Sequence, residues 1–201
     1  MKSAFPNSRH WVFDLDGTLT LAVHDFAAIR SELSIPNGSD ILEHLESLPE
    51  TESKVLHSRL QDIELELAHL TEAAVGAAAL IEELHARGAQ LGILTRNTKG
   101  NALRTLELIG LGGYFERAHV LGRDEALPKP DPDGIHQLAA LWRAEPAEMV
   151  MVGDYLYDLQ AGRSAGTLTV HVDVTRDFRW PELTDIRVES LQEIIVHLTS
   201  C

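Results

Sequence analysis

The sequence has little cysteine, no long apolar run and a deficit of positive charge. Its 201 residues include one cysteine, Cys201, so an intrachain disulfide is excluded and a reducing compartment is expected. No run approaches the roughly 18 apolar residues that a membrane-spanning helix needs. The opening residues, MKSAFPNSRH, lack the apolar centre of a signal peptide. We therefore expect a cytoplasmic protein with no membrane partner.

Charge narrows the choice of partners further. The chain carries 17 lysine and arginine residues against 31 aspartate and glutamate residues, which gives a formal net charge of −14 at pH 7. Binding to nucleic acid or to anionic lipid requires a basic surface, so neither partner is expected. An acidic protein that handles phosphate groups must create positive potential locally, from a metal ion, a few basic side chains and helix N-termini. Nothing in the sequence indicates an oligomeric state.

Apolar segments alternate with helical segments over most of the chain. After a first strand at 11–13, residues 24–71 show helical periodicity and no strand pattern, which indicates a helical insert. Beyond it we expect strands at 90–94, 118–121, 149–152, 167–172 and 186–188, and helices at 73–87, 98–109, 133–142, 155–163 and 190–198. This alternation predicts an α/β fold with a parallel sheet and helices on both faces. The core domain would comprise 1–20 and 72–201, and the insert would be a separate domain at 21–71. The alternative is that the helices of 21–71 cover the sheet and form no domain of their own.

The chemistry begins where the first strand ends. Trp11, Val12 and Phe13 are followed by Asp14, Leu15, Asp16, Gly17 and Thr18. Two carboxylates at the carboxyl end of a buried parallel strand can share one site for a hard cation or a phosphate group. Asp-Gly is also a common turn. An EF-hand loop is excluded, because its sixth and twelfth positions would be Leu19 and Asp25 instead of glycine and glutamate.

Other polar residues stand at the ends of later strands. Thr95 follows 90–94, Asp154 follows 149–152, and Lys129 lies between two prolines after the third strand. Taken singly, Thr95 or Asp154 could cap a helix and Lys129 could be a solvated loop residue. Because the carboxyl ends of parallel strands meet at one edge, we expect the acids, the hydroxyl and the lysine to form one site.

The motifs together resemble those of the haloacid dehalogenase superfamily of phosphohydrolases, in its phosphoglycolate phosphatase and β-phosphoglucomutase branch. The four motifs occur in family order as Asp14–Thr18 (DLDGT), Thr95 in GILT, Lys129 in PKPDP and Gly153–Asp158 (GDYLYD). The resemblance implies a Rossmann-like core, with 21–71 as a small helical cap domain.

The resemblance also implies roles for the site residues. Asp14 would be the nucleophile and Asp16 the general acid and base. Mg²⁺ would be held by Asp14, the Asp16 main-chain carbonyl and Asp154. Asp158 would orient Lys129 or a metal-bound water. The phosphoryl oxygens would be held by Gly17, Thr95, Arg96, Asn97 and Lys129.

These roles imply a Mg²⁺-dependent phosphatase that hydrolyses a small phosphorylated metabolite through an aspartyl-phosphate. Asp16 argues against a dehalogenase, and Lys54 is interpreted as a surface residue and not a Schiff-base lysine. Departures at Leu19–Val23 and Arg96-Asn97 argue against phosphoglycolate itself. A phosphosugar mutase, a phosphoacceptor domain and a non-catalytic binding module are the alternatives. Candidate substrate contacts in the insert are the loop Ile35–Ser39, which offers Asn37 and Ser39, and the cationic or titratable side chains of His24, Arg30, Lys54 and Arg59.

Overall fold

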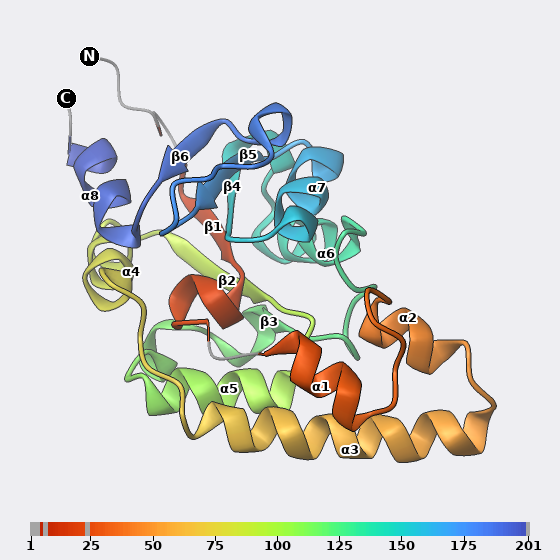
Figure 1. Cartoon of the computed structure of the whole chain (residues 1–201). Coiled ribbons are helices and arrows are strands. Elements are labelled where there is room, and N and C mark those ends of the chain that lie inside the picture. The colour runs from red at the N-terminus through yellow and green to blue at the C-terminus, as the bar shows by residue number, and fades with distance from the viewer. Residues whose placement is uncertain (1–4, 6–7, 23–24, 200–201) are drawn as a thin grey trace. The chain divides into compact units, whose positions relative to one another are not determined.

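The computed structural model describes residue 5, residues 8–22 and residues 25–199. The chain divides into two compact units, one formed by Met1–Ala22 with Thr71–Cys201 and the other by Val23–Leu70 (Figure 1). Residues 21, 22 and 71, which the sequence pattern placed in the insert, fall in the larger unit. The reason is backbone pairing between the two ends of the insert, since the Leu21 amide donates to the Glu72 carbonyl at 2.9 Å and Thr20 forms an antiparallel bridge with Ala73.

The larger unit is built on a six-stranded sheet whose neighbouring strands are all parallel, in the order β3-β2-β1-β4-β5-β6 (Figure 1). β1 lies in the middle, and its Phe13 pairs with Ile93 of β2 and with Val152 of β4. The residues that follow these three strands therefore come level at one edge of the sheet. The strands are β1 (His10–Phe13), β2 (Gln90–Leu94), β3 (Val120–Leu121), β4 (Met149–Gly153), β5 (Leu168–Val172) and β6 (Ile186–Val188).

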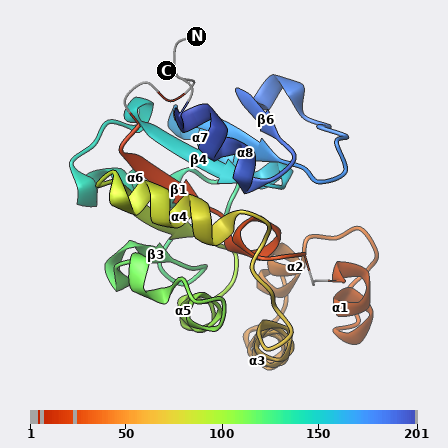
Figure 2. The same cartoon turned by 90° about the vertical axis from the view of Figure 1, so that its left-hand side faces the viewer.

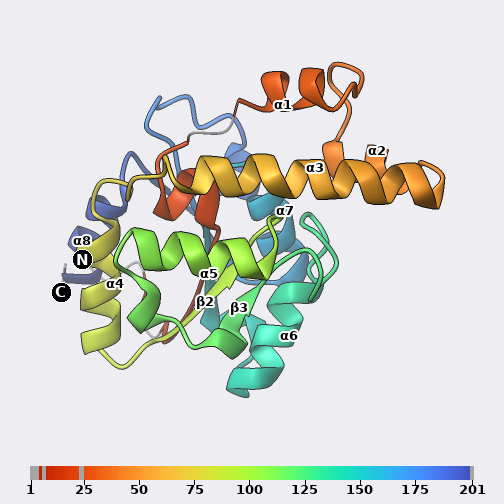
Figure 3. The same ribbon diagram turned by 90° about the horizontal axis from the view of Figure 1, so that it is seen from below.

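Helices cover both faces of this sheet, because successive strand side chains point to opposite sides. Trp11 and Phe13 pack in one core with α4 (Ala77–Ala86), α5 (Lys99–Leu108) and α8 (Leu191–Thr199). Val12 packs on the other face with α6 (Asp133–Trp142) and α7 (Leu156–Ala165). Figure 2 shows α4 and α8 across the near face, and Figure 3 shows α4 and α5 opposite α6 and α7. The expected α/β fold with helices on both faces is confirmed.

The smaller unit contains α1 (Phe26–Glu32), α2 (Ile41–Glu46) and α3 (Glu50–Ala68). Asp25 and Asp40 cap the first two helices, each accepting from backbone amides of the first turn. An apolar cluster that includes Ile29, Leu45 and Leu60 holds the three helices together. His24 lies outside the described residues.

Two of the differences from the predicted element boundaries have a clear structural cause. α4 was expected over 73–87 but begins at Ala77, because Gly76 takes a left-handed conformation with φ of 84° and Ala73 pairs with Thr20. β3 was expected over 118–121 but contains Val120 and Leu121 only, since residues 117–119 form a 3-10 turn. Among the described residues, no helix has the length and apolar character that crossing a membrane requires.

Candidate active site

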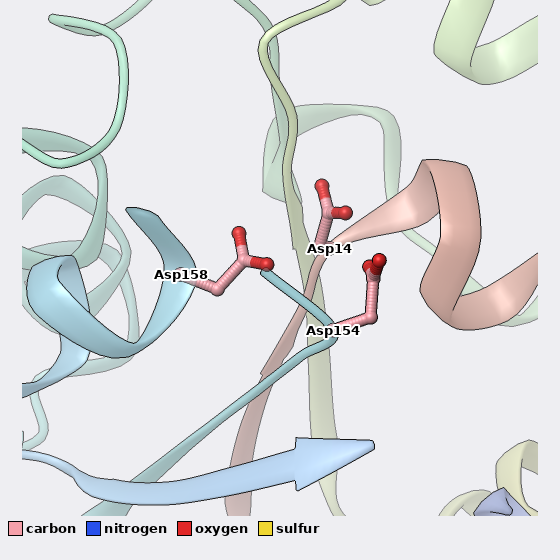
Figure 4. A group of neighbouring side chains, drawn as sticks. All are labelled: Asp14, Asp154 and Asp158. Carbon is pink, nitrogen blue, oxygen red and sulfur yellow. The ribbon is translucent and has the colours of Figure 1, made fainter. Parts of the chain in front are cut away.

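Three carboxylates meet at the carboxyl edge of the sheet. Asp14 follows β1, Asp154 follows β4, and Asp158 lies in the first turn of α7 (Figure 4). One carboxylate oxygen from each lies within 4.8 Å of the others. Oxygen ligands grouped in this way suit a hard divalent cation such as Mg²⁺.

Lys129 joins two of these acids. Its Nζ lies 2.6 Å from Asp14 Oδ1 and 2.6 Å from Asp158 Oδ1, and all three side chains are buried. Burial opposes the charge on the lysine, but the two carboxylates outweigh that effect and raise the pKa of Lys129. The ammonium group has three protons, so two hydrogen bonds leave one for a further oxygen. Asp158 therefore contacts Lys129 directly, and its role in orienting this lysine stays a prediction.

The carboxyl groups of Asp14 and Asp154 lie in surroundings that disfavour their charged forms. Burial raises the pKa of Asp14 well above its ordinary value, Lys129 opposes that rise, and the charges of Asp158, Asp154 and Asp16 add to it. Burial and the charge of Asp158 raise the pKa of Asp154 to about 7, against the hydrogen bond from Thr18. Thr18 Oγ1 donates to Asp154 Oδ1 at 2.8 Å and so fixes that carboxylate. A bound cation would relieve this repulsion.

Both oxygens of Asp158 are already engaged inside the chain. Oδ1 accepts from Lys129, and Oδ2 accepts from the backbone amide of Tyr155 at 3.0 Å, which caps α7. Asp14 and Asp154 are therefore the side chains whose free oxygen atoms fit a metal ion.

Two glycines permit the close approach of these groups. Gly17 has φ of 95°, and a Cβ at this position would lie 2.7 Å from Asp154 Oδ2. A Cβ on Gly153 would lie 2.2 Å from the Cβ of Asp158. A side chain at either glycine would clash with a site aspartate, and Gly17 also takes a backbone conformation that favours glycine.

Asp16 lies at the same edge, partly exposed, and is tied to the loop after β2. Asn97 Nδ2 donates to Asp16 Oδ2 at 3.4 Å. Thr95 is buried, and its Oγ1 accepts from the Asn97 backbone amide at 3.0 Å. The sequence pattern indicated Asn97 as a phosphate ligand and did not indicate this contact with Asp16.

The predicted phosphate ligands lie at this edge and differ in the hydrogen bonds that they already make within the chain. The backbone amides of Gly17 and Asn97 donate to Thr20 Oγ1 and Thr95 Oγ1, so a phosphoryl oxygen would have to replace a threonine hydroxyl there. Arg96 is partly exposed, and its guanidinium carbon lies 4.8 Å from the centre of the Tyr157 ring. The contacts of Lys129 and Thr95 leave each a proton to donate.

The cations of the insert are engaged within the insert. Arg30 Nε donates to the Ser39 carbonyl at 2.8 Å and so supports the loop Ile35–Ser39. Lys54 pairs with Glu50 at 2.6 Å on an exposed helix face, as its interpretation as a surface residue requires. Arg59 pairs with Glu32. Nothing in these contacts assigns the three side chains to a substrate.

The parallel α/β fold, with an acidic site and a buried lysine at the carboxyl edge of its sheet, points to a class of hydrolases. A family model described as haloacid dehalogenase-like hydrolase matches residues 30–172, which contain Thr95, Lys129, Asp154 and Asp158. The chain belongs to the haloacid dehalogenase-like hydrolases and is an enzyme of that family.

Individual relatives cover most of the chain. The uncharacterized hydrolase YOR131C of Saccharomyces cerevisiae is 34% identical over 192 residues, which cover 92% of this chain and 88% of that protein. Pyrophosphatase PpaX of Listeria innocua is 31% identical over 178 residues, covering 80% and 81%. The crystal structure of a predicted phosphoglycolate phosphatase from Haemophilus somnus matches with a TM-score of 0.76 over 95% of this chain and 98% of that chain. At 21% identity, that last match is a likeness in fold.

Proposed function

We propose that this protein is a Mg²⁺-dependent phosphatase that hydrolyses a small phosphorylated metabolite through an aspartyl-phosphate on Asp14. The observation that carries the proposal is the position of Asp14 between Lys129, 2.6 Å away, and the carboxylate of Asp154. A buried carboxylate held by a neighbouring cation is a suitable nucleophile for phosphorus. The name of the PpaX relative, a pyrophosphatase, supports phosphate chemistry.

The proposed reaction has two displacements. An oxygen of Asp14 attacks phosphorus, the bond from phosphorus to the leaving oxygen breaks, and Asp16 gives its proton to that oxygen. Asp16 then accepts a proton from water, the water oxygen attacks phosphorus, and the bond to Asp14 breaks to release inorganic phosphate. Lys129 and the Thr95 hydroxyl donate to the phosphoryl oxygens, and Arg96 adds positive charge beside them.

A divalent cation fits the donor set of Asp14 and Asp154, with the main-chain carbonyl of Asp16 as a third ligand. When bound, Mg²⁺ would neutralise the charge of the carboxylates and the phosphoryl group. Asp158 would hold Lys129 in place from outside the ligand set. The helical unit 23–70 would act as the substrate-selecting cap.

The test is phosphate release with and without Mg²⁺ from p-nitrophenyl phosphate, glycerol phosphate, phosphoglycolate, β-glucose 1-phosphate and pyrophosphate. We expect Mg²⁺-dependent release by the wild type and none above background by Asp14→Asn. Asp62→Asn, which alters an exposed aspartate of α3, is the matched control and should keep full activity. A folded wild type that releases phosphate from none of these compounds would contradict the proposal.

The same panel separates the alternatives. A phosphosugar mutase would convert β-glucose 1-phosphate into glucose 6-phosphate without releasing phosphate. A non-catalytic module would bind a phosphorylated compound and release nothing. The four motif residues Asp14, Asp16, Lys129 and Asp154 are all present, which favours catalysis over a binding role.

A further inference from the structure

A chain of aromatic contacts runs along the larger unit beside the carboxylates. The ring centres of Tyr155 and Tyr157 lie 5.3 Å apart, and those of Tyr155 and Trp180 lie 5.5 Å apart, both edge to face. Trp180 in turn contacts His171 at 5.3 Å, and His171 contacts Phe178 at 5.6 Å. We call this set the aromatic strip: Tyr155, Tyr157, His171, Phe178 and Trp180.

The strip lies at the same edge of the sheet as the candidate active site. Tyr155 directly follows Asp154, so their Cα atoms are about 3.8 Å apart. His171 lies near the carboxyl end of β5 and pairs with Gly153, and Trp180 belongs to the segment between β5 and β6. Both the strip and the carboxylates belong to one compact unit.

Charge and the exposure of most of its members distinguish the strip from a buried core. Tyr155 is 49% exposed, and Tyr157, Phe178 and Trp180 are partly exposed, whereas His171 is buried beneath them. The guanidinium carbon of Arg96 lies 4.8 Å from the Tyr157 ring centre, and that of Arg179 lies 4.9 Å from the Trp180 ring centre. A chain with a net charge of −14 thus places two arginines against the rings that flank Tyr155. Rings and guanidinium planes together favour a planar, electron-rich group.

We propose that the aromatic strip binds the planar ring of the substrate's leaving group, and that the preferred substrates are nucleoside monophosphates. This inference rests on the proposed phosphatase function. With the phosphoryl group at Asp14, the sugar would extend past Asp154 and the base would stack on Tyr155. Pyrophosphate and phosphoglycolate have no ring and would leave the strip unused, so they should be poorer substrates.

The first experiment measures binding without catalysis. Adenosine, which carries no phosphate, is titrated into the protein while tryptophan fluorescence is followed, with ribose as the comparison. We expect saturable quenching by adenosine and none by ribose, with Trp180 as the reporter.

The Tyr155→Ala variant should weaken adenosine binding by about tenfold, the range of losing one stacked base, while Tyr155→Phe should retain it. Tyr114→Ala, which removes a tyrosine outside the strip, should bind adenosine as the wild type does. Equal responses to adenosine and ribose, or equal affinities in Tyr155→Ala and the wild type, would overturn the inference.

The second experiment compares kinetics on adenosine 5′-monophosphate and glycerol phosphate. Tyr155→Ala should raise KM for the nucleotide about tenfold more than KM for glycerol phosphate. A general fall in kcat on both esters would indicate a structural role and would overturn the inference. If no ester is hydrolysed but adenosine still binds through Tyr155, the proposed phosphatase function fails and the strip stands as a nucleoside-binding surface. If glycerol phosphate is hydrolysed and the nucleotide has no advantage, the strip inference alone fails.

Discussion

Asn97 Nδ2 donates to Asp16 Oδ2 at 3.4 Å, and this contact joins the loop after β2 to the loop after β1. The orientation of the amide is set by its other end, because Asn97 Oδ1 accepts from the Thr98 backbone amide at 2.8 Å and from Asn101 Nδ2 at 3.2 Å. Asn97 is only 5% exposed, so solvent does not replace these partners. Asn97 is therefore placed to orient Asp16, the proposed general acid.

The Asn97→Ala variant should lose more activity on poor leaving groups than on good ones. An alkoxide needs a proton as it departs, whereas p-nitrophenolate departs without one, so only the first reaction depends on a well-placed Asp16. We expect kcat to fall about tenfold or more on glycerol phosphate and much less on p-nitrophenyl phosphate. Steady-state kinetics on the two esters measure the difference.

Asp16→Asn is the reference variant, because it removes the acid itself. Its loss of activity on glycerol phosphate should exceed its loss on p-nitrophenyl phosphate by more than in Asn97→Ala. An equal loss on both esters in Asn97→Ala would mean that the residue supports the loop and does not position the acid. Circular dichroism on each variant checks that the fold is intact.

Gly17→Ala should damage metal binding more than stability. The added methyl would lie 2.7 Å from Asp154 Oδ2 and would push that carboxylate away from its place beside Asp14. Gly166→Ala is the matched control, because Gly166 has a similar φ of 85° but open space around its Cβ position. Both variants carry a left-handed backbone penalty of roughly 1–2 kcal/mol, but only Gly17→Ala should raise the Mg²⁺ concentration that half-activates the enzyme. Similar Mg²⁺ requirements in the two variants would contradict this view of Gly17.

Local sequence signals predicted the helix and strand boundaries correctly where no contact between distant parts of the chain overrode them. α6 was expected over 133–142 and is found as Asp133–Trp142, since a proline precedes it and Arg143 ends it with φ of 54°. α4 was predicted too long, because alanine at 73 and 74 favours helix while the pairing of Thr20 with Ala73 is a contact distant in sequence. Strand length at the sheet edge was likewise overestimated for β3.

The site could be predicted as a set of residues but not as a set of contacts. Asp14 and Asp154 directly follow parallel strands, Asp158 lies in the first turn of α7, and Lys129 lies in the connection between β3 and α6, so the four come together at one edge of the sheet. The link between Asn97 and Asp16 depends on side-chain orientation across 81 positions of sequence, which no local pattern encodes. The stacking of Arg96 on the Tyr157 ring has the same origin, and no local pattern encoded it either.

Replacing Lys129 by methionine should strongly destabilise the protein. Lys129→Met leaves Asp14 and Asp158 buried without their counter-ion, and removing one partner of a buried pair costs roughly 3–5 kcal/mol. Lys54→Met, which breaks an exposed pair with Glu50, should cost roughly 0.3–0.5 kcal/mol. Urea unfolding at pH 8 measures both changes. The loss in Lys129→Met should shrink at pH 5, because Asp14, whose pKa is already raised by burial, takes up a proton there. A loss independent of pH would contradict the ion-pair explanation.

Stability without metal should fall as the pH rises from about 4 to about 7. The folded protein raises the pKa of Asp154 from 3.8 to about 7 and also raises that of Asp14, so the folded state binds protons more tightly than the unfolded state. Stability from this source is complete below the unfolded pKa and is lost as the pH passes through the folded pKa.

Mg²⁺ competes with these protons, so its affinity should weaken about tenfold for each proton and pH unit below 7. Thermal unfolding in EDTA and in Mg²⁺ at pH 5, 6, 7 and 8 should therefore give curves that diverge as the pH rises. A Mg²⁺-induced rise in Tm that is as large at pH 5 as at pH 8 would place the ion away from Asp14 and Asp154.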